Sequence, residues 1–149
     1  MAMETYMKRQ RGMTLIELLV VVTIIGILAA IAVLSYKSSI RKSRRADAKI
    51  ALANIAQQFE RCYTRYNSYT NAGCAVVLPF NTPQNTYTIA ADPAGTPVAG
   101  VNDQTFAIIA TPLGDQVKDT PCPALTLNQA GVKGIGVIGA TTAQIANCW

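Results

Sequence analysis

The sequence predicts an α+β fold in which one long N-terminal helix packs against a small antiparallel β-sheet. Three patterns support this prediction. An apolar run opens the chain, an apolar stripe with helical spacing follows it, and short segments of alternating apolar residues fill the second half. We expect three parts: a basic leader (residues 1–12), a membrane helix (13–35), and a globular head (36–149) that includes the second half of the helix.

The apolar run covers Met13–Leu34 and contains one charged residue, Glu17. As a helix, 22 residues span roughly 33 Å, which is enough to cross a bilayer. A secretory signal peptide usually has a shorter apolar region followed by a small-residue cleavage site, and Ser35-Tyr36-Lys37 offers no such site. An ordinary membrane anchor is the stronger alternative, but it gives no reason for Glu17.

The helix is expected to continue beyond the apolar run, because neither Pro nor Gly occurs between Ile27 and Gln58. Apolar residues at spacings of three and four then mark one helix face. They are Ala48, Leu52, Ile55, Ala56, Phe59, Cys62, Tyr63 and Tyr66. Arg45, Lys49 and Arg61 lie mostly off this face. The prediction is one helix from about residue 14 to about residue 66.

Three strands are predicted at residues 85–91, 105–111 and 124–128, where apolar residues alternate with polar or small ones. Residues 131–134 are expected to start a fourth strand. Residues 67–85 are rich in turn-forming residues, and the Gly-rich stretch up to Thr142 has no period that predicts an element.

The charge is unevenly distributed. Residues 35–69 carry eight basic and two acidic residues, a net charge of +6, whereas residues 70–149 carry two basic and four acidic residues, a net charge of −2. Lys8, Arg9 and Arg11 favour a cytoplasmic N-terminus by the positive-inside rule, but the basic run 41–45 favours the opposite orientation. The cysteines decide for an exported head, because disulfides need an oxidising compartment.

Four cysteines, Cys62, Cys74, Cys122 and Cys148, follow the apolar run. An even count in a small exported domain predicts two disulfides, for which three pairings are open. A zinc site is disfavoured because the chain has no Cys-x-x-Cys pair and no His. Catalysis is disfavoured too, because a His base, a phosphate-binding Gly loop and a clustered carboxylate pair are all missing. We therefore expect no enzyme, no metal and no cofactor.

The segment Lys8-Arg9-Gln10-Arg11-Gly12-Met13-Thr14-Leu15-Ile16-Glu17 resembles the prepilin processing motif of type IV pilin precursors. The resemblance implies that prepilin peptidase cleaves between Gly12 and Met13 and methylates the new amine of Met13. The family usually has Phe after the cleavage site, so Met13 is a variant. Translation could start at Met1, Met3 or Met7.

Glu17 has a physical rationale within this resemblance. An ionised carboxylate in hydrocarbon costs a few kcal/mol, on the order of 3, even on gentle insertion scales. In type IV pilins the acid at this position pairs with the N-terminal amine of a neighbouring subunit, which implies an assembly role for Glu17. Favourable interaction with the helix dipole is a compatible, smaller effect. The apolar helices would then pack together as the filament core.

Two further motifs resemble PilE-type minor pilins: Gln58-Phe59-Glu60-Arg61-Cys62-Tyr63, and Leu125–Gly134 followed by Cys148-Trp149. This resemblance implies the pilin fold and the disulfides Cys62–Cys74 and Cys122–Cys148. It also implies a minor pilin that promotes pilus assembly, twitching motility and adhesion. The alternatives are a major pilin, a DNA-binding pilin for DNA uptake, and a type II secretion pseudopilin.

The implied partners are other pilin subunits, prepilin peptidase and the inner membrane, with the head in the periplasm before it reaches the extracellular pilus. DNA is a further candidate partner. It is disfavoured because residues 70–149 are net negative. The basic run at residues 41–45 follows the membrane segment, where it would meet lipid head groups or the filament interior.

Overall fold

The computed structural model describes residues 12–93, 100–136 and 140–149. The chain divides into two compact units, Met1–Ser39 and Ile40–Trp149, and each is described by itself. The predicted leader at residues 1–12 lies outside the described residues except for Gly12.

Helix α1 runs from Leu15 to Tyr66 and confirms the predicted long helix to within one residue. Thr14 caps its start, since its hydroxyl oxygen accepts a hydrogen bond from the backbone N–H of Glu17 at 3.3 Å. The helix ends at Asn67, whose φ of 53° is left-handed and whose N–H bonds the Tyr63 carbonyl at 2.7 Å. Asn tolerates this conformation better than most residues, so it suits a helix end.

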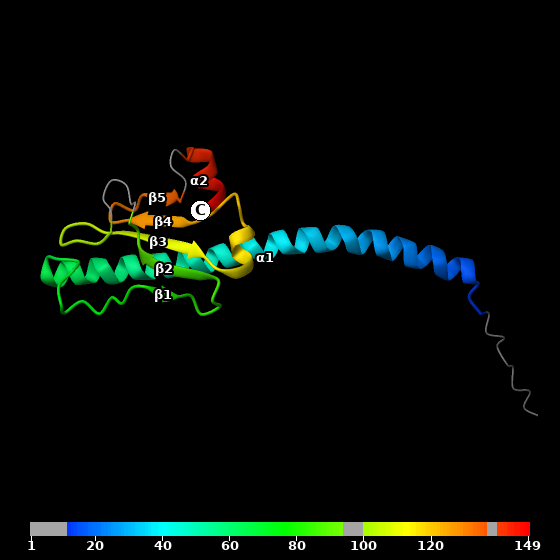
Figure 1. The fold of residues 1–149 in the computed structure, drawn as a ribbon, viewed down its shortest axis with the longest axis horizontal. Coiled ribbons are helices and arrows are strands. Elements are labelled where there is room, and N and C mark those ends of the chain that lie inside the picture. Colours follow the sequence, from blue (N-terminus) through cyan, green and yellow to red (C-terminus); the bar gives the residue numbers. More distant parts are fainter. Residues whose placement is uncertain (1–11, 94–99, 137–139) are drawn as a thin grey trace, which may run out of the picture. The chain divides into compact units, whose positions relative to one another are not determined.

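Five antiparallel strands form one sheet in the order β1-β2-β3-β4-β5 (Figure 1). The strands are β1 (Phe80–Asn81), β2 (Tyr87–Ala91), β3 (Ala107–Pro112), β4 (Leu125–Asn128) and β5 (Lys133–Ile135). Ile89 pairs with Ala110, and Ala110 pairs with Leu125. All three are fully buried, so the register aligns one apolar face across the three central strands.

The structure confirms the three predicted strands and the fourth, with shifted ends. Asn85 belongs to a turn, where its φ is 56°, so β2 begins two residues later than predicted. Ala91 at the other end of β2 is exposed because the strand extends past the core. Strand β1 was not predicted: two residues are too short to show alternation, and they lie in the turn-rich segment.

Two short helices were also not predicted. The 3₁₀ helix η1 (Gly114–Lys118) and helix α2 (Thr142–Cys148) flank the last two strands in sequence. Thr141 begins α2 with a capping box, in which its side chain accepts from the Gln144 N–H and the Gln144 side chain accepts from the Thr141 N–H. The spacing of Thr141 and Gln144 is visible in the sequence, so this helix start could have been recognised.

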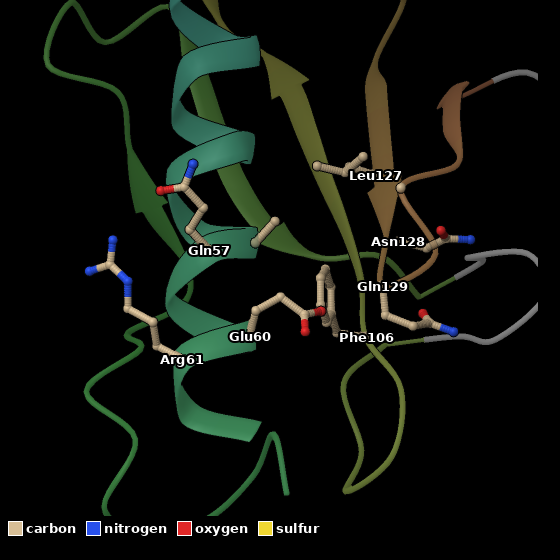
Figure 2. A pocket seen from close by; sticks show the side chains of 9 residues that line it. Gln57, Glu60, Arg61, Phe106, Leu127, Asn128 and Gln129 are labelled. Atoms are coloured by element: carbon tan, nitrogen blue, oxygen red, sulfur yellow. The ribbon is translucent and has the colours of Figure 1, made fainter. Parts of the chain in front are cut away.

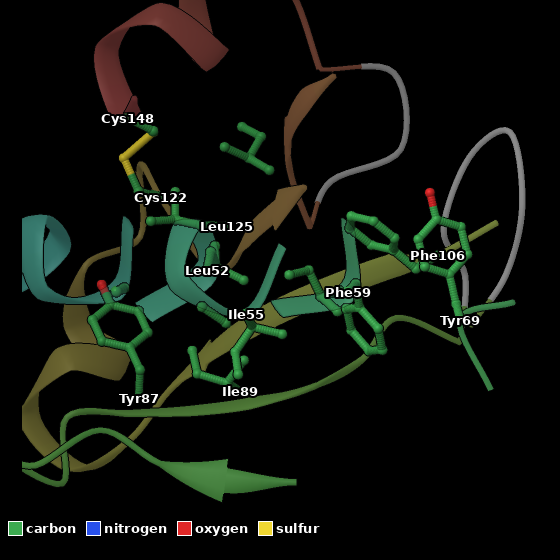
Figure 3. Packing of buried hydrophobic residues seen from close by; sticks show 14 residues of the cluster. Leu52, Ile55, Phe59, Tyr69, Tyr87, Ile89, Phe106, Cys122, Leu125 and Cys148 are labelled. Atoms are coloured by element: carbon green, nitrogen blue, oxygen red, sulfur yellow. A yellow bond between two sulfur atoms is a disulfide. The ribbon is translucent and has the colours of Figure 1, made fainter. Parts of the chain in front are cut away.

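The core of the Ile40–Trp149 unit lies between the apolar stripe of α1 and the inner face of the sheet (Figure 3). Ala48, Leu52, Ile55 and Phe59 are all buried, as the stripe predicts. The Phe59 and Phe106 rings stack with centroids 5.0 Å apart. Tyr69 meets both rings edge-on, at centroid distances of 6.1 Å and 5.1 Å. This aromatic cluster joins the end of α1 to β3.

Candidate functional site

The first candidate site is the peptide before α1. Gly12 and Met13 precede the helix, Met13 is 68% exposed, and nothing lies within 4 Å of a Cβ built on Gly12. A peptidase needs an extended, accessible backbone, and α1 begins only at Leu15. The cap at Thr14 therefore separates the predicted cleavage site from the helix.

In the Met1–Ser39 unit, the apolar part of α1 is exposed all round. Every large apolar side chain described from Leu15 to Val33 is at least 42% exposed. By length and composition this helix could cross a membrane. The hydroxyl of Thr23 donates to the carbonyls of Leu19 at 2.7 Å and Val20 at 2.9 Å. The uncharged polar group of Thr23 is thus satisfied within the helix, as a lipid environment requires.

Glu17 lies in the first turn of α1 and is exposed. Its carboxylate forms no hydrogen bond or ion pair with any residue in the described part of the chain. The surrounding side chains, such as Ile16, Leu18 and Val21, offer it no donor. Glu17 is therefore an acid on an apolar stretch of helix without a partner among the residues that the structure describes, which is the arrangement that a partner from another molecule would complete.

The four cysteines form the two disulfides Cys62–Cys74 and Cys122–Cys148. The first joins the last turns of α1 to the loop that follows. The second joins α2 to the loop before β4, and both of its cysteines are 1% exposed. These pairings are the ones that the resemblance implied. The cysteines lie in the Ile40–Trp149 unit, whereas Gly12, Met13 and Glu17 lie in the other unit.

A network of polar contacts, termed here the polar lock, joins α1 to the C-terminal segment. The sequence did not predict it. The guanidinium of Arg45 donates from Nε and Nη2 to the two carboxylate oxygens of Asp119, each at 2.6 Å. It also bonds the carbonyl of Asn147 at 3.3 Å. The Arg45 side chain is 11% exposed and that of Asp119 is 2% exposed. The bidentate hydrogen bond and the charge of Asp119 hold the pKa of Arg45 above its usual value, despite burial.

Two neighbours extend the polar lock. The Gln116 amide donates to Asp119 at 3.1 Å and to the buried hydroxyl of Tyr87 at 3.0 Å. Lys49 donates to the backbone oxygen of Trp149 at 2.7 Å, and burial followed by the charge of Arg45 lowers the pKa of Lys49. Arg45 was expected off the buried helix face. This expectation was wrong, because the C-terminal segment covers that side of α1.

A second polar cluster closes the opposite end of the unit. The hydroxyls of Ser68 and Thr70 both donate to the carboxylate of Asp103, and these hydrogen bonds lower its pKa. Nearby, the Tyr69 hydroxyl donates to the Glu60 carboxylate at 3.0 Å. Burial, then this acid, raises the pKa of Tyr69 to about 12. The loop after α1 is therefore held against the loop before β3.

An open pocket of about 430 Å³ lies between α1 and the β4–β5 hairpin. Figure 2 shows Glu60 extending from α1 toward Phe106, with Leu127 and Gln129 on the far side. The lining is mainly apolar, with amide and charged groups that include Gln57 and Arg61. The sequence did not predict this pocket, because it depends on how far the hairpin stands from the helix.

Metal ligation finds no support in the described residues, which contain no group of three or more His, Cys, Asp or Glu side chains that could hold an ion. The candidate sites are the peptide before α1, the acid Glu17 and the pocket beside α1, which suit processing, assembly and surface recognition.

Comparisons with known proteins agree with this interpretation. The family model described as "Type IV minor pilin ComP, DNA uptake sequence receptor" matches residues 35–126, and the model "Prokaryotic N-terminal methylation motif" matches residues 7–33. The type IV major pilin PilA of Myxococcus xanthus (strain DK1622) is 39% identical over 74 residues. That match covers 48% of this chain and 34% of PilA, about a third of the relative's length.

Two solved structures are similar. A type IV pilin from Shewanella oneidensis is 27% identical with a TM-score of 0.43, and the match covers 73% of this chain and 97% of that one. The Neisseria meningitidis non-core minor pilin PilV is 17% identical with a TM-score of 0.48, and the match covers 68% of this chain and 92% of that one.

The ComP model covers more than half of the chain, including the second half of α1, both cysteines of the first disulfide, strands β1 to β3 and the start of β4. The methylation motif covers the predicted cleavage site and the apolar run. The chain therefore belongs to the type IV pilin family, within the family of the minor pilin ComP.

Proposed function

We propose that this chain is made as a prepilin, is cleaved between Gly12 and Met13 by prepilin peptidase, and is methylated on the new amine of Met13. The methylation motif across residues 7–33 and the exposed peptide before Thr14 support this proposal. Before assembly, the apolar part of α1 holds the chain in the inner membrane with the head in the periplasm.

The function that the geometry supports best is that of a minor subunit of a type IV pilus, assembled through α1. The single observation that carries it is Glu17, an acid that has no partner in the described part of the chain and lies on a stretch of α1 that is otherwise exposed and apolar. A neighbour's methylated N-terminal amine provides the opposite charge that Glu17 lacks. Pairing would offset the cost of the carboxylate in an apolar core, about 3 kcal/mol on insertion scales, and would select one axial register.

Substitution of Glu17 by Gln tests the assembly role, because it removes the charge and keeps the shape. We expect processing to continue, as shown by the mobility shift on cleavage, while incorporation into sheared pili falls at least tenfold. Glu60→Gln is the matched control, since it changes an acid of the same helix within the head. Normal incorporation of the Glu17 variant would refute the charge-pairing role.

The subunit's abundance tests the minor assignment. The ComP family is described as minor pilins, whereas the relative PilA is a major pilin. We expect this chain to be a small fraction of the subunits in sheared pili, and its deletion to reduce surface pili, twitching motility and adhesion. A dominant band of this protein in the filament would make it a major pilin, and normal piliation and motility after deletion would exclude the assembly role.

DNA binding is the second candidate function, and the matching family, which is that of a DNA uptake sequence receptor, favours it. In the sequence analysis, DNA binding was disfavoured because residues 70–149 carry a net negative charge. The Ile40–Trp149 unit as a whole, however, carries nine basic and six acidic residues, because α1 contributes seven of the basic ones. A gel-shift titration of the full mature chain in detergent with duplex DNA tests the idea. Binding should weaken steeply between 50 and 200 mM salt, and absence of any salt-sensitive shift would exclude it.

A further inference from the structure

The structure divides the five basic residues between Arg41 and Lys49 of α1 into two groups. Arg45 and Lys49 are committed to the polar lock. The other three, Arg41, Lys42 and Arg44, are termed here the basic collar. Their side chains form no hydrogen bond or ion pair with the residues that the structure describes. Lys42 is exposed, and Arg41 and Arg44 are half-buried.

The acids close to the basic collar do not neutralise it. Asp115 is bonded to Lys118 at 2.6 Å, and that hydrogen bond is the main reason for its lowered pKa. Arg44 and Arg41 add only weaker Coulombic contributions to that shift. Asp47 is the one other acid on this part of α1, and Asp119 is bound to Arg45. Three cations thus share a short stretch of helix with an excess of positive charge.

The basic collar follows the apolar run closely in the sequence. The apolar run ends at Leu34, and Arg41 and Arg44 follow seven and ten residues later, which corresponds to about 10 and 15 Å of helix, beyond the head-group layer. The head-group layer on one side of a bilayer is roughly 5–8 Å thick. Side chains on a helix lean toward its N-terminus, which here is the apolar run. Long basic side chains can therefore reach back to the head groups.

The three positive charges of the basic collar are unfavourable for the proposed membrane orientation unless another group neutralises them. Basic residues that follow a membrane segment on its exported side oppose the orientation that the leader favours. The Arg45–Asp119 ion pair removes one such charge from this conflict, but no ion pair within residues 12–93, 100–136 and 140–149 removes the other three. An anionic head group would do so.

We propose that Arg41, Lys42 and Arg44 bind the phosphates of anionic phospholipid head groups while the chain is in the membrane. This proposal rests on the membrane-inserted stage proposed above. It sets the depth of the head before assembly and gives the subunit a preference for anionic lipid. DNA offers the same phosphate chemistry. Lipid is favoured because the three residues lie within four positions of one helix, beginning seven residues after the end of the apolar run.

Native mass spectrometry of the full mature chain, released from mild detergent with equal amounts of phosphatidylglycerol and phosphatidylcholine, tests the proposal. We expect the anionic lipid to be retained preferentially. Because each basic residue near an anionic surface strengthens association about fivefold, Arg41→Gln, Lys42→Gln and Arg44→Gln together should reduce the preference by up to ~100-fold. The control variant, Arg61→Gln, Arg65→Gln and Lys133→Gln, makes the same charge change outside the basic collar and should keep the preference.

Three outcomes would overturn the proposal: equal retention of both lipids by the unmodified chain, an unchanged preference in the collar variant, or an equal loss in the control. A collar variant that loses DNA binding but keeps its lipid preference would assign the collar to DNA instead. Retention of the chain in phosphatidylcholine vesicles after an alkaline wash tests membrane insertion separately. Circular dichroism of each variant checks that the head is folded.

Discussion

Removal of the negative charge of Asp119 should destabilise the head strongly. In Asp119→Asn, the guanidinium of Arg45 loses its counter-ion and one of its two hydrogen bonds of 2.6 Å, because the Asn amide keeps only one acceptor oxygen, while it stays largely buried, at 11% exposure. Breaking a buried pair by removing one partner typically costs about 3–5 kcal/mol. Arg45 keeps some solvent and its bond to Asn147, so we expect the low end, about 3 kcal/mol. That reduces the ratio of folded to unfolded protein by about 150-fold.

Urea denaturation of the full chain in detergent, with the disulfides intact, measures this free energy of unfolding. Trp149 is the only tryptophan and its backbone oxygen is bonded to Lys49, so its fluorescence reports on the polar lock itself. Asp115→Asn is the matched control: it breaks an exposed pair with Lys118 and should leave the midpoint unchanged.

The double variant Arg45→Met and Asp119→Leu separates charge from packing. It leaves no orphan charge, so it should be more stable than Asp119→Asn alone. If Asp119→Asn unfolds at the same urea concentration as the unmodified chain, the polar lock contributes nothing measurable and the reasoning fails.

Three further predictions concern the head. The titration of Tyr69 should leave the free energy of unfolding unchanged below pH 10 and should lower it as pH rises toward 12. The reason is that folding raises the pKa of this phenol from about 10 to about 12, so the folded protein binds the proton more tightly. The loss of stability is at most about 3 kcal/mol. Tyr69→Phe should be less stable than the unmodified chain at pH 8 but should lose less stability up to pH 12, and parallel pH profiles in urea would contradict this. Replacing Cys122 and Cys148 together by Ser should cost about 3.5 kcal/mol, more than the pair Cys62 and Cys74, because the closed loop spans 26 rather than 12 positions; an equal or reversed order of denaturation midpoints would contradict the loop argument. Leu52→Ala should cost about 2–5 kcal/mol by leaving a cavity in the core, whereas the exposed Ile50→Ala should cost far less in the same measurement.

Local sequence patterns were enough to predict the main helix, the central strands and the processing motif. The prediction of α1 follows from the absence of Pro and Gly between Ile27 and Gln58 and from its apolar stripe, and the central strands follow from alternation. The processing motif from Lys8 to Glu17 led to the prepilin interpretation, which the methylation-motif match supports. Each of these features is encoded within a few neighbouring residues, because helix and strand periodicities are short-range. The roles of Gly12, Met13 and Glu17 in cleavage and assembly stay predictions of this motif.

Only the tertiary structure shows which charged side chains are buried and paired within the protein. Arg45, Lys42 and Arg44 are indistinguishable in the sequence as members of one basic run, yet Asp119 lies 74 positions from Arg45 and binds that residue alone among them. The pocket between α1 and the β4–β5 hairpin and the contact of Lys49 with Trp149 are likewise long-range. An ion pair depends on where the chain returns to the helix, and that is set by packing of the whole core rather than by neighbouring residues.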